Sequence, residues 1–318
     1  MKAAVIRKYG KPEVFQIEDM PEPAPKPKQV KVEIIASSVN PVDWKIRSGA
    51  LAVLTGWKFP RILGGDFSGK VVECGSEVND IRVGDEVFGL SNAMSIGRAY
   101  AEFITCDADK LAIKPNKLNF LESAGIPLAG STAYQALHHM CEIKPGMRVL
   151  IIGATGGVGH FAVQIAKAEN CQVTGVCHSR NAELAKQIGC DEVLAYDKAD
   201  ITKSKDKYDI LFDAAAKYGY LSCRSLLTSQ GTYVCTIPTP LLMVMHGFSY
   251  IFPWKRGRFV GVNSNRKDLD QLARLANEDQ LRPFIENIFP LEKIAEAHAL
   301  SETEKARGKI AIRISDEI

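Results

Sequence analysis

The rhythm of apolar and polar positions changes about a third of the way along the chain. In the first part, short β-rich runs alternate with Gly, Pro and Asp residues that favour turns. These runs are residues 2–6, 30–35, 69–73, 86–88 and 101–105. Short strands with frequent turn signals are typical of a β-barrel or sandwich. The first third of the chain therefore predicts a β domain.

From about Phe120 onward, helical stretches alternate with buried strands. The apolar runs of strand length are residues 148–152, 172–176, 192–194, 208–212, 231–235 and 258–262. Helical stretches separate most of these runs, as in a parallel sheet that is covered on both faces. This part of the chain predicts an α/β fold with a doubly wound parallel sheet.

The C-terminal part continues with a helix at 268–276, a strand at 285–289, a helix from Leu291 and a last strand at 309–314. We expect this last strand to pair with the N-terminal β unit, which makes the β domain discontinuous. A chain of 318 residues is longer than one core usually supports. The expected domains are a β domain of residues 1–119 and 265–318, and a sheet domain of residues 120–264.

Composition narrows the class of protein. The chain is 46% hydrophobic and 24% charged, as a soluble globular protein is. Its basic residues are scattered and its net charge is +3, so we expect no nucleic-acid partner. The longest apolar stretch, 241–254, is interrupted by polar residues and is too short to span a bilayer, so we expect no transmembrane segment. We interpret this stretch as a loop that contacts substrate, another subunit or a membrane surface.

The eight cysteines are far apart in the sequence, and none forms a Cys-x-x-Cys pair. Buried free thiols in a reducing, cytoplasmic environment are the simplest interpretation, because free Cys behaves as a small apolar residue. A disulfide framework or a metal site is the alternative.

A glycine-rich turn follows the first strand of the predicted sheet. The turn consists of Gly153, Ala154, Thr155, Gly156, Gly157, Val158 and Gly159, and a helix-compatible segment comes next. Glycines permit a tight turn and let the backbone approach a pyrophosphate, and the start of the following helix stabilises its charge. The order of strand, turn and helix predicts a dinucleotide site. A glycine-rich connection without a ligand is the alternative.

The end of the second strand of this sheet indicates which nucleotide is bound. Ser179 and Arg180 follow it, and no carboxylate appears there before Glu183. A guanidinium offers paired donors to a 2′-phosphate, whereas NAD sites usually place an acid here. We therefore predict NADPH as the cofactor. Alternatively, Ser179 only caps the next helix and Arg180 is solvated.

Several motifs in the same order resemble the medium-chain dehydrogenase/reductases, and within them the quinone oxidoreductase or zeta-crystallin-like branch. They are residues 38–43 with Arg47, residues 64–69, residues 84–89, residues 129–134, the glycine turn, and Gly308-Lys309. The resemblance runs almost end to end. It implies a GroES-like β domain that carries most of the substrate site, a Rossmann domain, a cofactor between the two, and a homodimer.

The sequence differs from the zinc alcohol dehydrogenases at the residues that hold their zinc. Asn40 stands where those enzymes carry their first catalytic cysteine, and Asp66 stands where they carry a histidine. The four-cysteine lobe of their structural zinc is also missing. A catalytic zinc needs about three protein ligands, mostly N or S, so we expect no metal.

Without a Lewis acid, the acceptors to expect are those that take a hydride readily, namely quinones and α,β-unsaturated carbonyls (enals and enones). Asn40 can donate a hydrogen bond to the acceptor oxygen, although an Asn before Pro41 also suits a turn. The resemblance places Thr132, Ala214, Thr236 and Asn263 near the nicotinamide, Tyr196 near the adenine ribose, and Lys309 in the cofactor site.

Two other functions fit the same residues. One is a zinc-type alcohol dehydrogenase, and the other is an NADPH-binding structural or regulatory protein without catalysis. The sequence does not name the physiological acceptor or the proton donor.

Overall fold

The computed structural model describes residues 1–91, 97–248 and 256–317. The chain forms two compact units. The first unit is Met1–Ser131 with Asn263–Ile318, and the second unit is Thr132–Val262. Residues 120–131 and 263–264, which the sequence assigned to the sheet domain, belong to the first unit.

The first unit is built on a seven-stranded sheet in the order β15-β16-β3-β5-β6-β8, with β7 also paired to β3. A smaller sheet has the order β2-β1-β4. The strands are β1 (Lys2–Ile6), β2 (Phe15–Asp19), β3 (Gln29–Val39), β4 (Arg61–Ile62), β5 (Asp66–Cys74), β6 (Glu86–Leu90), β7 (Phe103–Asp107), β8 (Leu111–Ile113), β15 (Ile285–Pro290) and β16 (Lys309–Arg313). The predicted β domain is confirmed.

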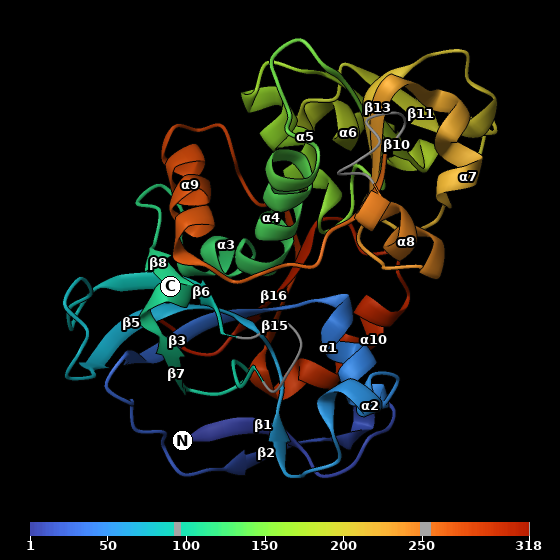
Figure 1. Ribbon diagram of the computed structural model, residues 1–318. Coiled ribbons are helices and arrows are strands. Elements are labelled where there is room, and N and C mark those ends of the chain that lie inside the picture. The colour runs from blue at the N-terminus through green and yellow to red at the C-terminus, as the bar shows by residue number, and fades with distance from the viewer. Residues whose placement is uncertain (92–96, 249–255, 318) are drawn as a thin grey trace. The chain divides into compact units, whose positions relative to one another are not determined.

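The end of the chain returns to its beginning inside this unit. β16 pairs antiparallel with β3, with Ile310 opposite Val39 and Ile312 opposite Ser37. In Figure 1 the red C-terminal strand β16 accordingly runs with the blue strand β3 in one sheet. The prediction that the last strand joins the N-terminal β unit is therefore confirmed.

Strand β7 begins two positions later than predicted, at Phe103. Its expected first residue, Ala101, instead forms a bridge with Ala3 of β1. The next residue also pairs with β1, since Glu102 N donates a hydrogen bond to Lys2 O at 3.0 Å. The apolar run thus divides its pairing between two sheets, which its pattern alone does not reveal.

Helix α1 starts at the point where β3 ends. Asn40 is extended, with φ −121° and ψ 154°, and Pro41 takes the first helical position, where its missing N–H costs nothing. Gly49 ends the helix in the left-handed region at φ 87°. The first unit contains α1 (Pro41–Ser48), α2 (Ala52–Thr55), α3 (Phe120–Ala124), α9 (Arg266–Asn277) and α10 (Ile294–Glu302), and α4 (Pro127–Tyr134) contains the division between units.

The second unit contains a six-stranded sheet in the order β11-β10-β9-β12-β13-β14, and every neighbouring pair is parallel. The strands are β9 (Arg148–Ile152), β10 (Gln172–Cys177), β11 (Glu192–Ala195), β12 (Tyr208–Asp213), β13 (Leu227–Cys235) and β14 (Arg256–Phe259). The predicted doubly wound parallel sheet is confirmed. β14 ends before the predicted 258–262 does, because its last partner, Cys235, is the last residue of β13.

The helices of the second unit include α5 (Gly159–Ala168), α6 (Ala182–Ile188), α7 (Tyr220–Cys223) and α8 (Pro240–Phe248). The interpretation of 241–254 as a loop is wrong for 241–248, and 249–254 lie outside the described residues. Good helix formers such as Leu and Met follow Pro240 there, and proline suits a helix start. α8 packs on β14 closely enough that a Cβ on Gly257 would lie 3.0 Å from Met245 Sδ.

The interiors of both units are apolar. In β1, residues 3–6 are completely buried, and in β9 residues 149–151 are too. All eight cysteines carry free thiols, seven of them buried and Cys74 partly so, as the sequence predicted. Among the described residues, no helix is long and apolar enough to cross a membrane.

Candidate functional site

The glycine turn in the second unit connects β9 to α5. Gly153 has φ +79°, and a Cβ there would lie 2.9 Å from the Cβ of Ala215. A Cβ on Gly159 would lie 2.0 Å from the carbonyl oxygen of Gly153, a distance that atoms cannot adopt. Only glycine therefore suits these two positions.

Gly156, in the middle of the turn, is in a different situation. A Cβ there would have one neighbour within 4 Å, the carbonyl oxygen of Gly153 at 3.3 Å. The backbone at Gly156 is therefore open on the side where a side chain would stand. A backbone that is open at the start of a helix suits the close approach of a pyrophosphate.

Other predicted residues follow the carboxyl ends of neighbouring strands. Ser179 and Arg180 come after β10, Tyr196 after β11, Ala214 after β12 and Thr236 after β13. In a parallel sheet these ends lie at one edge, where ligands bind.

Hydrogen bonds connect these loops. Ala214 N donates to Ile152 O at 3.2 Å, and Tyr196 N donates to Cys177 O at 3.1 Å. Asn181 Nδ2 donates to Thr155 Oγ1 in the glycine turn at 3.4 Å. These bonds bring the residues that follow β10, β11 and β12 together with the glycine turn.

Ser179 donates hydrogen bonds to the carboxylate of Asp197, a residue that was not among the predicted site residues. Its backbone N donates to Asp197 Oδ1 at 2.7 Å, and its hydroxyl donates to Asp197 Oδ2 at 2.6 Å. These bonds lower the pKa of Asp197 to about 2. The signal for Asp197 was its place two residues after β11, at the same sheet edge.

The alternative role of Ser179 as a helix cap does not hold. Ser179 is the first residue of a short 3₁₀ helix that is capped by His178, and Asn181 precedes α6. Arg180 is exposed and forms no ion pair within the described chain. Its guanidinium is therefore accessible to an anionic ligand.

Asp213, at the end of β12, organises the loop that contains Ala214. Its carboxylate accepts hydrogen bonds from the backbone N of Tyr218 at 2.7 Å and of Lys217 at 3.2 Å. Burial raises the pKa of this carboxyl above its ordinary value, although these N–H groups oppose the rise. Asp213 holds the loop in place beside the glycine turn.

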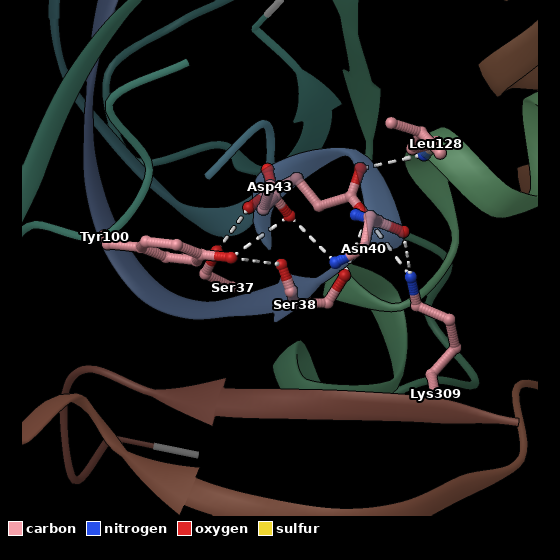
Figure 2. A network of polar contacts seen from close by, with 8 residues as sticks. Ser37, Ser38, Asn40, Asp43, Tyr100, Leu128 and Lys309 are labelled. Carbon is pink, nitrogen blue, oxygen red and sulfur yellow. Dashed lines mark hydrogen bonds and ion pairs between the residues drawn. The ribbon is translucent and has the colours of Figure 1, made fainter. Parts of the chain in front are cut away.

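A network of buried polar side chains lies in the first unit, around the end of β3 (Figure 2). Asn40 Oδ1 accepts a hydrogen bond from Lys309 Nζ at 2.6 Å, and Asn40 Nδ2 donates to Asp66 Oδ2 at 2.8 Å. Lys309 Nζ also lies 3.5 Å from Asp66 Oδ2. None of the three side chains is more than 2% exposed, so the amide of Asn40 is held between a buried cation and a buried anion.

Asp66 is surrounded by donors. In addition to Asn40 and Lys309, Ser38 Oγ donates to its Oδ2 at 2.6 Å, and Leu128 N donates to its Oδ1 at 2.8 Å. Burial lowers the pKa of Lys309, and the nearby carboxylates oppose that effect. The ion pair and these hydrogen bonds together compensate the cost of burying both charges.

The network continues on the other side of Asn40. Asp43 Oδ2 accepts from Asn40 N at 2.8 Å and from the Tyr100 hydroxyl at 3.1 Å, and His298 Nε2 lies 3.3 Å from that hydroxyl. Burial raises the pKa of Asp43 to about 7 and that of Tyr100 well above its ordinary value. Burial, with the Arg47 charge nearby, lowers the pKa of His298 to about 3. The motifs of the sequence analysis contained Asp43 but did not assign it a role.

The remaining predicted cofactor residues are distributed over both units. Thr132 is the first residue of the second unit and is 6% exposed. Asn263 and Lys309 belong to the first unit. Lys309 takes part there in the buried network with Asn40. Among the described residues, no three His, Cys, Asp or Glu side chains are grouped as metal ligands would be.

The chain resembles known proteins over most of its length. Residues 26–116 match the alcohol dehydrogenase GroES-like domain, and residues 188–312 match the zinc-binding dehydrogenase family. The chain is 35% identical over 312 residues to the quinone-oxidoreductase homolog, chloroplastic, of Spinacia oleracea, covering 91% of each chain.

Two further matches agree with this. An NADPH-dependent alkenal/one oxidoreductase, chloroplastic, of Arabidopsis thaliana is 30% identical, over 98% of this chain and 79% of that protein. The structure of the quinone oxidoreductase from Coxiella burnetii is 32% identical, with a TM-score of 0.88 and 99% of both chains covered.

Proposed function

This chain belongs to the medium-chain dehydrogenase/reductase superfamily, among the quinone oxidoreductases, and on that premise we propose that it is a zinc-independent, NADPH-dependent reductase of quinones or α,β-unsaturated carbonyls. As a member of this family it is an oxidoreductase that uses a nicotinamide nucleotide. The finer parts of the proposal are the phosphorylated cofactor, the acceptor class and the absence of zinc.

The glycine turn supports the nucleotide site. The residues that would hold the pyrophosphate are the backbone groups of 153–159, because a Cβ at Gly156 would have one neighbour within 4 Å and no side chain caps the start of α5. Arg180 would hold a 2′-phosphate, since it is exposed and forms no ion pair within the described chain. When it is bound, the reduced nicotinamide supplies the hydride.

Asn40 is the residue that we propose to act on the acceptor. One of its two Nδ2 hydrogens goes to Asp66, and the other can be donated to the acceptor oxygen, on which negative charge develops. Lys309 orients the amide, because its ammonium group donates to Oδ1 and so determines that Nδ2 lies on the other side, toward Asp66. Lys309 also places a positive charge beside the amide.

The surroundings of Asp66 support chemistry without zinc. Its carboxylate accepts hydrogen bonds from Ser38, Asn40 and Leu128 and pairs with Lys309, so both oxygens are already engaged. A zinc ion would have to compete with the Lys309 cation for the same oxygen. Asn40 is likewise held at both ends of its amide.

The single observation that carries the proposal is the glycine turn, with its open backbone at Gly156 and its contact to Asn181, the residue after Arg180. The test is a panel of quinones, enals, enones and saturated aldehydes, run with NADPH and followed by nicotinamide absorbance. We expect turnover with the first three classes and little with saturated aldehydes, together with less than stoichiometric zinc. Stoichiometric zinc with chelator-sensitive activity would indicate an alcohol dehydrogenase instead.

NADPH binding without turnover of any acceptor would support the third possibility, a binding protein without catalysis. The contribution of Arg180 is tested separately, because Arg180→Ala should weaken NADPH binding and leave NADH binding unchanged. Equal affinity for both nucleotides in both proteins would contradict the choice of NADPH.

We also propose that the protein is a cytoplasmic homodimer. The eight free thiols support a reducing compartment. Two of the relatives are named chloroplastic, so cell fractionation is the direct test of location. Light scattering of the purified protein tests the dimer.

A further inference from the structure

We infer that Asp197 sets how strongly this site prefers NADPH over NADH, by holding a carboxylate where the 2′-phosphate would bind. The inference rests on the proposed use of a nicotinamide nucleotide and concerns the selectivity of the same site. The predicted phosphate ligands were Ser179 and Arg180. The structure gives one of them, Ser179, an anionic partner inside the protein.

Asp197 already occupies the donors of Ser179. The backbone N and the hydroxyl of Ser179 both donate to this carboxylate, at 2.7 and 2.6 Å. His178 Nδ1 is also near it, at 3.7 Å from Asp197 Oδ1. A 2′-phosphate that used Ser179 would have to displace the carboxylate from two charge-assisted hydrogen bonds.

Charge adds to this competition. The pKa of Asp197 is about 2, so the carboxylate is ionised throughout the neutral range. A phosphate monoester carries about −1.5 to −2 charges at pH 7. Two anions within a few ångströms repel each other, and because Asp197 is exposed, this repulsion should weaken as the salt concentration rises.

The carboxylate does not disfavour NADH in the same way. A ribose 2′-hydroxyl is neutral and can donate a hydrogen bond to a carboxylate oxygen, as it does to the acid of NAD sites. Arg180 acts in the opposite direction, because its guanidinium favours the phosphate. The two side chains on this edge of the sheet thus have opposing effects on selectivity, and Asp197 reduces the preference for NADPH that Arg180 gives.

The test measures binding directly, with Asp197→Asn as the main variant. An Asn can still accept from Ser179 through Oδ1, but it lacks the charge. Dissociation constants of NADPH, NADH, adenosine 2′,5′-bisphosphate and 5′-AMP are measured by titration calorimetry. We expect the variant to bind NADPH and the bisphosphate about tenfold more tightly, which corresponds to about 1.4 kcal/mol. Its dissociation constants for NADH and 5′-AMP should change less than twofold.

Two control variants separate the local charge from other effects. Asp197→Glu keeps the charge and should not gain affinity for NADPH. Asp206→Asn removes the same charge from the opposite edge of the sheet, where Asp206 pairs with Arg148 at the start of β9. It should change the affinity for neither NADPH nor NADH. If Asp197→Asn does not fold, Asp197→Ser replaces it, with the same expected gain for NADPH.

The outcomes distinguish this inference from the proposed function. If Asp197→Asn leaves the ratio of the NADPH and NADH dissociation constants within twofold of the wild type, the inference is wrong even when the enzyme reduces quinones. If the ratio changes tenfold but no acceptor is reduced, the inference stands and the proposed reaction is wrong. If neither nucleotide binds to any variant, both are wrong.

Discussion

Asn40 lies between a buried cation and a buried anion, and this position makes it the most informative single residue of the proposed acceptor site. Its Oδ1 accepts from Lys309 and its Nδ2 donates to Asp66, so the orientation of the amide is determined by charge. It also precedes α1, which links the local backbone to the network. Both roles that the sequence allowed for Asn40, a turn residue and a polar donor, are therefore compatible.

The first prediction concerns this amide. Asn40→Ala should lower kcat about tenfold to a thousandfold with quinones and enones, because it removes a donor to the developing negative charge. The measurement is steady-state kinetics with NADPH at saturation. Asn119→Ala is the matched control, since Asn119 accepts from Glu122 N at the start of α3 and lies outside the network. Full turnover of Asn40→Ala with every acceptor would remove Asn40 from the mechanism.

His298 and Asp43 make opposite contributions to the pH dependence of stability. His298 has a folded-state pKa of about 3, below its ordinary 6.5, so its contribution is fully present above pH 6.5 and is lost as pH falls toward 3. Asp43 has a folded-state pKa of about 7, above its ordinary 3.8, so its contribution is present below pH 3.8 and is lost as pH rises through 7. Between about pH 4 and 6.5 the two contributions offset each other.

The second prediction separates these groups. His298→Gln keeps a hydrogen-bonding amide beside Tyr100 but cannot be protonated. Relative to the wild type, its free energy of unfolding should rise by about 1.4 kcal/mol for each pH unit below 6.5. Urea unfolding at a series of pH values measures this. His139→Gln, on an exposed histidine, is the control, and a variant difference that stays constant from pH 7 to 4 would contradict the assignment.

At the scale of the element, the glycine turn combines two separate requirements. Gly153 and Gly159 are needed because a Cβ would collide with the turn itself. Gly156 is not needed for packing in that sense, since a Cβ there would make one close contact, at 3.3 Å. Folding and nucleotide binding therefore impose glycine at different positions of one motif.

The third prediction uses this difference. Gly156→Ala should leave the thermal midpoint nearly unchanged but weaken NADPH binding at least about tenfold, because the methyl group stands where the pyrophosphate approaches. Gly159→Ala should destabilise the protein by about 2 kcal/mol or more, as overpacking does. Calorimetry and thermal unfolding measure the two effects. Gly219→Ala, where a Cβ meets nothing within 4 Å, is the control. Unchanged NADPH affinity in Gly156→Ala would argue against a pyrophosphate at this turn.

At the scale of the whole molecule, the first unit depends on both ends of the chain. β16 lies between β15 and β3 in the seven-stranded sheet, and its residues 310–312 are nearly or completely buried. Lys309, at its start, also completes the buried network. A strand inside a sheet cannot be removed without leaving backbone groups of its neighbours unpaired.

The fourth prediction follows from this position. Truncation after Gly308 should abolish cooperative folding of the first unit. Truncation after Ile314 should cost less than about 1 kcal/mol, because Ile314 N still donates to Ile35 O when Ser315 is lost, and the contact of Glu317 with Lys70 is exposed. Circular dichroism and urea unfolding of both truncated chains check this. A cooperative transition in the chain that ends at Gly308 would contradict it.

Much of the architecture could be predicted from local pattern. β9 was placed correctly from its run of apolar residues, and the parallel sheet followed from the alternation with helices. β13 was predicted to begin at Gly231 but begins at Leu227, where Tyr208 of β12 pairs with it across a register shift. Such a start depends on a partner strand and carries no apolar signal of its own.

The sequence by itself determined the kinds of element, their order and the glycine turn, because hydrophobic periodicity and the backbone freedom of glycine act over a few residues. Only the tertiary structure decided that Lys309 contacts Asn40 and Asp66, and that Asp197 binds Ser179. These contacts join residues that are far apart in the chain, and their energies depend on burial and on which charges become neighbours. A pattern read along one strand or helix contains neither quantity.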